Sequence, residues 1–318
     1  MASTAVLSAQ TTITKAFHDP SVGDVVNNIN LAGTPDNSAA GVNTIFNNSS
    51  LTQGGVVSGT YSAPSTAEAS SYPGSTLKYV NGSNTVFYKQ TAAKLEITGL
   101  VTTDATLNFS TNNGTFISYP ATYGYSETDN AASGTFSTPQ GSGNFSGTIN
   151  LSGDAWGTLL IGSKTYTNVT RIKSIQNFIL TVFGFTAATV VNTSYTYYDA
   201  THKFPLFTTT NAVITPTGGA AQTTSGTQAL NEVFLDTSDF IKKNSFKIYP
   251  NPAQDFIEFK GDMSNYSKAN IYSLDGKLIK TSDLKAGKVQ VSELPASSYF
   301  IEVSGNKTQS ESVKFIKK

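Results

Sequence analysis

The chain contains 318 residues, of which 13 % are charged, and it carries no formal net charge and no cysteine. Without cysteine there is no disulfide framework, thiolate metal site or thiol nucleophile, and without an excess of basic residues the chain is not expected to bind nucleic acid. The length suits two domains, and a surface of Ser, Thr, Asn and Gly in place of charges favours an extracellular all-β protein.

Residues 1–10 are expected to be the remnant of a signal peptide or a disordered segment. Residues 3–10 are mostly small and apolar, and they contain a plausible cleavage site after Ala9. A full signal peptide would also have a basic region and a longer apolar stretch before this site.

Residues 11–216 are predicted to form one all-β domain, either a β-sandwich or a barrel-like sheet. Stretches rich in β-branched and aromatic residues are separated by turn signals such as Asn81-Gly82, and no window shows a sustained helical period. The longest apolar stretch, 178–191, is too short for a transmembrane helix and is predicted to be two strands that meet near Gly184. The expected strands include residues 54–61, 85–88, 94–98, 107–110, 148–151, 157–161 and 193–198.

The composition of the chain changes between residues 216 and 245. Up to residue 240 there are 8 basic and 13 acidic residues, a net charge of −5, whereas the remainder has 13 basic and 8 acidic residues, a net charge of +5. Residues 217–226 are rich in Gly, Ala and Thr and are expected to be flexible, either as a loop of the first domain or as part of a connection. Residues 217–244 are therefore predicted to be the interdomain linker.

Residues 245–318 are predicted to form a small immunoglobulin-like sandwich. A first strand stops at two prolines, which cannot donate to a ladder, and a Ser-Leu-Asp-Gly sequence at 273–276 predicts a hairpin. Seven short alternating strands in about 75 residues fit the sandwich pattern. They are expected at residues 246–249, 256–259, 269–272, 277–280, 289–291, 298–303 and 311–316.

Four motifs of this domain follow one another in a fixed order: Tyr-Pro-Asn-Pro at 249–252, Leu-Asp-Gly-Lys at 274–277, Leu-Pro-Ala-Ser-Ser-Tyr-Phe at 294–300 and Val-Lys-Phe-Ile-Lys-Lys at 313–318. In this order the domain closely resembles the type A sorting domain of the type IX secretion system of Bacteroidetes. One departure is Ser297, where the family usually has Gly. The resemblance implies that the sorting signal includes Tyr249, Pro250, Asn251, Pro252, Asp275, Gly276, Tyr299, Val313, Lys314, Phe315, Lys317 and Lys318.

The same resemblance implies a destination and partners. Such domains pass through the periplasm, are carried with their cargo across the outer membrane by the secretion translocon, and are removed by a sorting peptidase. The protein is therefore expected to be secreted or held on the outer-membrane surface. The first domain also resembles a group of exported Bacteroidetes β-proteins without an established activity, through segments 18–24, 40–43, 119–125, 154–160, 166–173, 195–198 and 203–206.

Charged residues of the first domain suggest few reaction centres. His18 with Asp19 and Asp24 fits either a metal or base cluster or, more simply, a capped turn. Asp36-Asn37 and Asp129-Asn130 fit calcium ligands or ordinary turns. Arg171, the only arginine, is expected to pair with a buried carboxylate. A glycosidase would need two facing carboxylates, and the candidates are Asp104, Glu127, Asp129, Asp154 and Asp199.

Aromatic residues give the best indication of a ligand. Tyr119, Tyr123 and Tyr125 lie around a predicted turn, and exposed aromatic faces beside amides bind sugars, although core packing explains such residues equally well. We therefore expect the first domain to be a binding, adhesion or structural module, with glycan as a ligand and no metal or cofactor. The alternative is a secreted polysaccharide-active hydrolase that uses acidic residues.

Overall fold

The computed structural model describes residues 10–234, 246–261, 263–284, 287–305 and 308–318. The chain divides into two compact units, Met1–Asp236 and Thr237–Lys318, and each is described by itself. Strands dominate both units, which confirms the all-β prediction. In the described part of the chain, no helix has the length and apolarity needed to cross a membrane.

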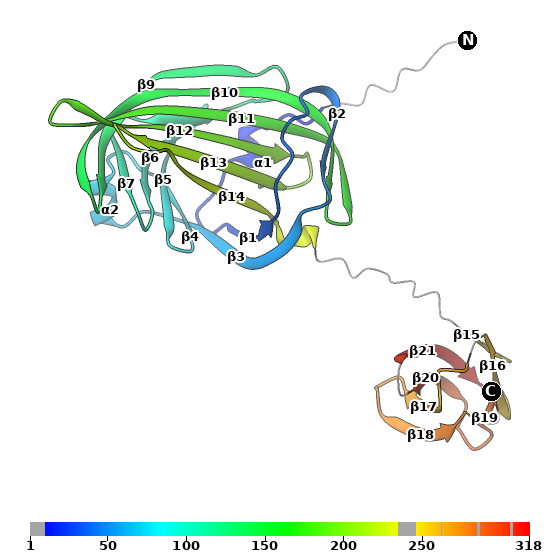
Figure 1. Cartoon of the computed structure of the whole chain (residues 1–318). Coiled ribbons are helices and arrows are strands. Elements are labelled where there is room, and N and C mark those ends of the chain that lie inside the picture. Colours follow the sequence, from blue (N-terminus) through cyan, green and yellow to red (C-terminus); the bar gives the residue numbers. More distant parts are fainter. Residues whose placement is uncertain (1–9, 235–245, 262, 285–286, 306–307) are drawn as a thin grey trace, which may run out of the picture. The chain divides into compact units, whose positions relative to one another are not determined.

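Twelve strands of the first unit form a closed, barrel-like antiparallel sheet in which neighbours follow chain order (Figure 1). The ring closes because the last strand pairs with the first, Ala229 lying opposite Ile29. Its strands are β1 (Val25–Ala32), β3 (Thr52–Ser62), β4 (Leu77–Asn81), β5 (Asn84–Gln90), β6 (Lys94–Val101), β7 (Thr106–Asn112), β9 (Ser126–Thr138), β10 (Gly141–Ile161), β11 (Lys164–Val182), β12 (Phe185–Tyr198), β13 (Phe207–Pro216) and β14 (Gln222–Leu230).

Two further strands and three short helical segments lie beside this ring. Strand β2 (Gly41–Asn48) runs parallel to the second half of β10, and β8 (Gly114–Ser118) pairs with the first half of β6. The helical segments are α1 (Lys15–His18), α2 (Thr66–Ser71) and the 3-10 turn η1 (Asn231–Val233).

The interior of the ring is filled by side chains. Buried and less buried residues alternate along β10 from Phe145 to Leu151, as expected for a strand with one face in a core. Phe109, Phe145 and Phe178 pack edge to face at its centre, with ring centroids 4.9 to 6.1 Å apart. A cavity of about 40 Å³ lies beside Tyr198. Side chains therefore pack the interior around these rings, and this cavity is about the size that a water molecule needs.

A second, smaller core lies on the opposite face of the sheet. Adjacent residues point to opposite faces of a strand, and accordingly Tyr198 joins the interior core while Tyr197 joins the second one. A register shift beside Asp154 separates the part of β10 that faces the interior core from the part that packs with Phe46 of β2. Strand β2 thus covers apolar surface that the ring alone would leave exposed.

The predicted boundary of the first domain needs a correction. Residues 222–230 form β14, which pairs with β13 and β1, so the linker predicted over 217–244 was placed too early. The first five residues of β14 are exposed on both faces, and they therefore carry no period-two apolar pattern for a sequence reading to detect. The signal remnant at 1–9 and the linker section from 235 to 244 lie outside the described residues.

The second unit is the predicted seven-stranded sandwich. One sheet has the order β15 (Phe246–Tyr249), β16 (Phe256–Gly261) and β19 (Lys288–Gln290). The other has the order β18 (Leu278–Asp283), β17 (Lys268–Ser273), β20 (Ser297–Gly305) and β21 (Thr308–Lys317). Their inner faces enclose fully buried residues such as Phe246, Ile257, Ile271, Ile301 and Phe315.

Candidate functional site

The Tyr-Pro-Asn-Pro motif of the second unit fastens the last strand of the chain. The Asn251 side chain accepts a hydrogen bond from the Ile316 backbone N–H (2.9 Å) and donates one to the Lys314 carbonyl oxygen (3.3 Å). The Ala253 N–H donates to the Ile316 carbonyl oxygen (2.7 Å), and the Lys318 N–H donates to the Ala253 carbonyl oxygen (2.9 Å). The motif therefore pairs with the outer edge of β21, while its two prolines and Tyr249 are exposed.

The other predicted sorting residues divide into structural and exposed ones. Tyr299 and Phe315 are buried and stack at 5.5 Å, and the Tyr299 hydroxyl donates to the Pro295 carbonyl oxygen (3.0 Å). Val313 is half-buried against the same core, and Lys317 is also buried, whereas Lys314 and Lys318 are exposed. The short basic end of the chain thus presents its charges beside the exposed Tyr-Pro-Asn-Pro motif.

A tight turn joins β17 and β18 at Asp275 and Gly276. Gly276 has a φ of 83°, which a residue with a Cβ adopts only at a cost, and its N–H donates to the Ser273 carbonyl oxygen (3.0 Å). The Ser273 hydroxyl donates to Asp275 and lowers the pKa of that carboxyl group. Ser297, at the family's usual glycine position, begins β20 without a left-handed φ, so the substitution carries no backbone strain.

Residues 247–318 match the family model of the secretion system C-terminal sorting domain. The second unit is a sorting domain. Its presence supports export through the type IX secretion system, with the protein released or attached at the cell surface. No curated protein and no solved structure matches the chain. The comparisons therefore give no function for the first unit, which is the cargo that the sorting domain accompanies.

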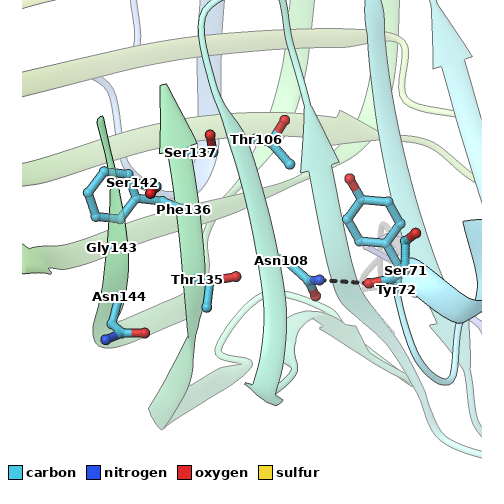
Figure 2. Close-up of a pocket in the computed structure, with 10 residues that line it drawn as sticks. All are labelled: Ser71, Tyr72, Thr106, Asn108, Thr135, Phe136, Ser137, Ser142, Gly143 and Asn144. Carbon is cyan, nitrogen blue, oxygen red and sulfur yellow. Dashed lines mark hydrogen bonds between the residues drawn. The ribbon is translucent and has the colours of Figure 1, made fainter. Parts of the chain in front are cut away.

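The cargo domain has a groove of about 400 Å³ on the outer face of β7, β9 and β10, beside the end of α2 (Figure 2). Strand register places polar residues of these three strands next to one another. The floor consists of two cross-strand rows: Thr106, Ser137 and Ser142 in the first, and Asn108, Thr135 and Asn144 in the second. Within the described part of the chain, no charged side chain lines this groove.

The wall of the groove is Tyr72, held at the end of α2. Its ring stacks on Phe87, with centroids 4.1 Å apart and planes inclined by 16°, and it covers Gly99 so closely that a Cβ there would lie 2.2 Å from the ring. Asn108 Nδ2 donates to the Ser71 carbonyl oxygen (2.6 Å), which ties the helix end to β7. The enclosed Asn108 Oδ1 has no hydrogen-bond partner, and it therefore leaves an acceptor beside the groove.

Helix α2 is itself fixed by its sequence. Ser65 accepts a hydrogen bond from the Glu68 N–H (3.3 Å) and Glu68 accepts one from the Ser65 N–H (2.7 Å), a complete capping box. Lys78 Nζ contacts both Glu68 oxygens at 2.7 and 2.8 Å. The hydrogen bonds from Lys78 and then from Ser65 lower the pKa of Glu68 to about 2. The ion pair with β4 thus anchors the helix that carries Tyr72.

The three tyrosines predicted as ligand contacts lie elsewhere. Tyr119 and Tyr125 pack against the interior core, and their hydroxyls donate to Asp19 (3.3 Å) and Glu127 (2.6 Å). Burial first, and then the neighbouring carboxylate, raises the pKa of Tyr125. These two side chains therefore do not form an open aromatic face, and Tyr123 as a ligand contact stays a prediction. The groove was not predicted, because its only signal in the sequence is alternating Thr, Ser and Asn in three strands.

His18 is a structural residue, as the capped-turn interpretation expects. The Thr14 N–H donates to Nδ1 (3.0 Å), and Nε2 donates to the Asp199 carbonyl oxygen (3.2 Å). Asp19 and Asp24 instead pair with Lys15 and Lys203. Over the described ranges, no group of three or more His, Asp or Glu side chains is arranged to hold a metal ion.

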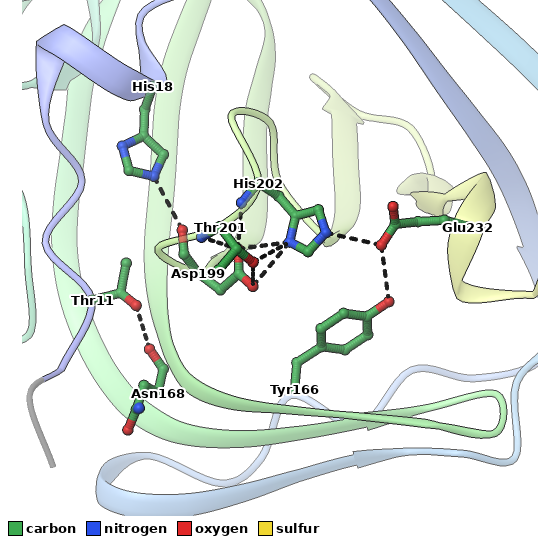
Figure 3. A network of polar contacts seen from close by, with 8 residues as sticks. All are labelled: Thr11, His18, Tyr166, Asn168, Asp199, Thr201, His202 and Glu232. Atoms are coloured by element: carbon green, nitrogen blue, oxygen red, sulfur yellow. Dashed lines mark hydrogen bonds and ion pairs between the residues drawn. The ribbon is translucent and has the colours of Figure 1, made fainter.

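His202 lies between two carboxylates (Figure 3). Its Nδ1 is 2.9 Å from both Asp199 oxygens, and its Nε2 is 2.9 Å from Glu232 Oε1, which also accepts a bond from the Tyr166 hydroxyl (3.4 Å). Burial would raise the pKa of Asp199, but hydrogen bonds from Thr201 and His202 outweigh it and lower the pKa. The network ties the β12–β13 connection to η1 and so holds the end of the barrel in place.

The candidate carboxylates of a hydrolase are engaged in separate interactions. Arg171 is 1 % exposed and forms two 2.8 Å bonds to Asp154, which confirms the predicted pairing with a carboxylate, although Asp154 is partly exposed and not buried. Glu127 pairs with Lys94, and Asp129 accepts from the Thr115 N–H (2.9 Å).

The remaining hydrolase candidate, Asp104, and the calcium candidates Asp36 and Asn37 also have contacts of their own. Asp104 is an exposed residue of the β6–β7 turn. Asp36 accepts bonds from the Ser38 hydroxyl (2.6 Å) and N–H (2.9 Å), which lower its pKa, and Asn37 Oδ1 accepts from the Tyr197 hydroxyl (2.8 Å). The contacts of Asp36 are those of an ordinary turn, whereas Asn37 bonds to a distant strand. None of these carboxylates lies in the groove.

Proposed function

We propose that the exported cargo domain is a binding or adhesion module for neutral carbohydrate, and that its site is the groove over β7, β9 and β10. The chemistry of the lining carries this proposal. Hydroxyls and amides exchange hydrogen bonds with sugar hydroxyls, and an aromatic ring offers a face on which sugar C–H groups pack. The six polar residues of the floor and the Tyr72 wall supply both kinds of contact.

The same lining selects against charged ligands. A uronic acid, sulfate or phosphate group placed in the groove loses hydration without gaining a cationic partner from the lining side chains. The strands under the groove form a closed ring over a packed core, so the site is held rigid before the ligand arrives. Both features support recognition of neutral polysaccharide at the cell exterior.

A glycan array followed by calorimetric titration with the purified full-length chain tests the proposal. Asn144→Ala removes a floor amide and should weaken binding of the identified neutral glycan about five- to tenfold, the usual effect of one lost hydrogen bond. Asn150→Ala, an exposed amide on the outer face of the same strand but away from the groove, is the matched control and should bind like the native chain. Two results would contradict this function. One is the absence of glycan binding in both the array and the titration, and the other is an equal loss of affinity in both variants.

A further inference from the structure

The hairpin that joins β11 and β12 ends in two exposed phenylalanines. Phe183 is 97 % exposed and Phe185 is 78 % exposed, although side chains of this kind normally contribute to folding by being buried. Val182 and Phe185 face each other as the last pair of the ladder, so Phe183 and Gly184 form a two-residue turn. The tip therefore presents a large apolar surface that the described cargo domain does not cover.

Phe183 is an unusual residue for the backbone conformation of this turn. Phe183 has a φ of 51° and Gly184 a φ of 84°. Two left-handed residues in such a turn favour Asn-Gly, and a bulky aromatic residue in this conformation is strained. Because Phe183 is placed there without a packing partner, its side chain does not stabilise the hairpin, and its presence points to contact with something outside the fold.

The segments that flank the tip are free of formal charge. Residues 174–198, 205–231 and 130–153 contain no Asp, Glu, Lys or Arg. These segments supply the neighbouring tips, since Ala188 pairs with Pro216 and Thr181 pairs with Asn144 at the same end of the sheet, where β11 and β12 converge at the left of Figure 1. Asp104 also lies at this end, because Thr106 pairs with Ser137 and so places the β6–β7 turn there. The segments next to the tip, however, offer no charged side chain for an ion pair.

We propose that this tip, defined by Phe183 and Phe185, inserts into the interfacial region of a lipid bilayer. A convex pair of aromatic side chains suits insertion, whereas a protein interface requires a broader buried surface. The turn is closed by ladder pairing, so few backbone groups enter the lipid without a partner, and the flanking Thr181 and Thr186 suit the headgroup layer. Without basic residues nearby, attachment depends on apolar burial and needs no anionic lipid.

Co-sedimentation of the full-length protein with phosphatidylcholine vesicles tests this proposal. Phe183→Asn combined with Phe185→Thr removes both rings, and the Asn favours the turn conformation, so the hairpin itself is expected to stay folded. The vesicle partition coefficient should fall at least about tenfold in this double variant. The matched control is Ile45→Thr with Val56→Thr, which removes two exposed apolar side chains elsewhere and should leave the coefficient unchanged.

Two further readouts separate insertion from other contacts. Phe183→Trp should retain binding and show quenching of its fluorescence by brominated lipid, and raising the NaCl concentration should not release the native protein. Absence of vesicle binding by the native chain at millimolar lipid, or equal binding by the double variant, would overturn the proposal. A concentration-dependent dimer that the double variant abolishes, without lipid binding, would assign the tip to self-association instead.

Discussion

Removing the Asp154 carboxylate should destabilise the cargo domain more than removing the whole ion pair. Arg171 is 1 % exposed and stays charged, whereas Asp154 is 20 % exposed. In Asp154→Ala the guanidinium keeps a bond to the Asn37 carbonyl oxygen (3.1 Å) and a weaker one to the Tyr197 hydroxyl (3.4 Å), but it loses its only bidentate partner.

Loss of one partner of a buried ion pair lowers the free energy of unfolding by about 3–5 kcal/mol. Because Arg171 keeps two other hydrogen bonds, the loss in Asp154→Ala should lie at the lower end of this range, about 3 kcal/mol. Replacing both residues, as in Arg171→Met with Asp154→Ala, removes the unpaired charge and should cost less, about 1–2 kcal/mol. Urea unfolding of both variants and the native chain, followed by circular dichroism, measures the difference. A double variant at least as unstable as Asp154→Ala would refute the reasoning.

Three further changes test the groove wall and the sorting domain. The pKa of Glu68 is lowered from 4.5 to about 2, so its ion pair with Lys78 stabilises the fold above pH 4.5 and is lost as the pH falls towards 2. Partial exposure limits this effect to about 1 kcal/mol. The protection of the α2 amides against hydrogen exchange, relative to the intrinsic rate at each pH, should fall over this range in the native chain but not in Glu68→Gln. Gly99→Ala should displace the Tyr72 ring and lower the free energy of unfolding, measured by thermal unfolding, by about 1–3 kcal/mol. It should also weaken glycan binding, and an unchanged affinity would argue against Tyr72 as the wall of the groove. Asn251→Ala should cost the sorting domain about 1–2 kcal/mol by releasing the edge of β21, which limited proteolysis of the C-terminus detects as faster cleavage than in the native chain.

The sorting domain was predictable from sequence because its signals are local. Each strand alternates over a few residues, and turns are marked by Pro250, Pro252 and Gly276. The motif order then indicated the family, which the match over 247–318 bears out. What the sequence did not reveal is the role of Asn251, because its partners at 314 and 316 lie more than 60 residues away along the chain.

The barrel and its groove depend on distant pairings. Closure joins residue 28 to residue 230, and β14 contributes exposed Thr, Ser and Gly that resemble a linker. The groove arises only when the registers of β7, β9 and β10 bring Thr106, Ser137 and Ser142 into one row. The pairing of Arg171 was predictable because the only guanidinium of the chain, placed in a predicted strand, requires a partner when it is buried.

Cell fractionation after deletion of residues 315–318 tests the account of this protein as an exported one most directly. The deletion removes the buried Phe315 and the contacts of β21 with Ala253, so the sorting domain loses both part of its core and its C-terminal edge. In a host with a type IX secretion system, the native chain should reach the medium or the cell surface, and the truncated chain should accumulate in the periplasm. Export of the truncated chain at the native level would contradict the assignment of the C-terminal domain as the sorting signal.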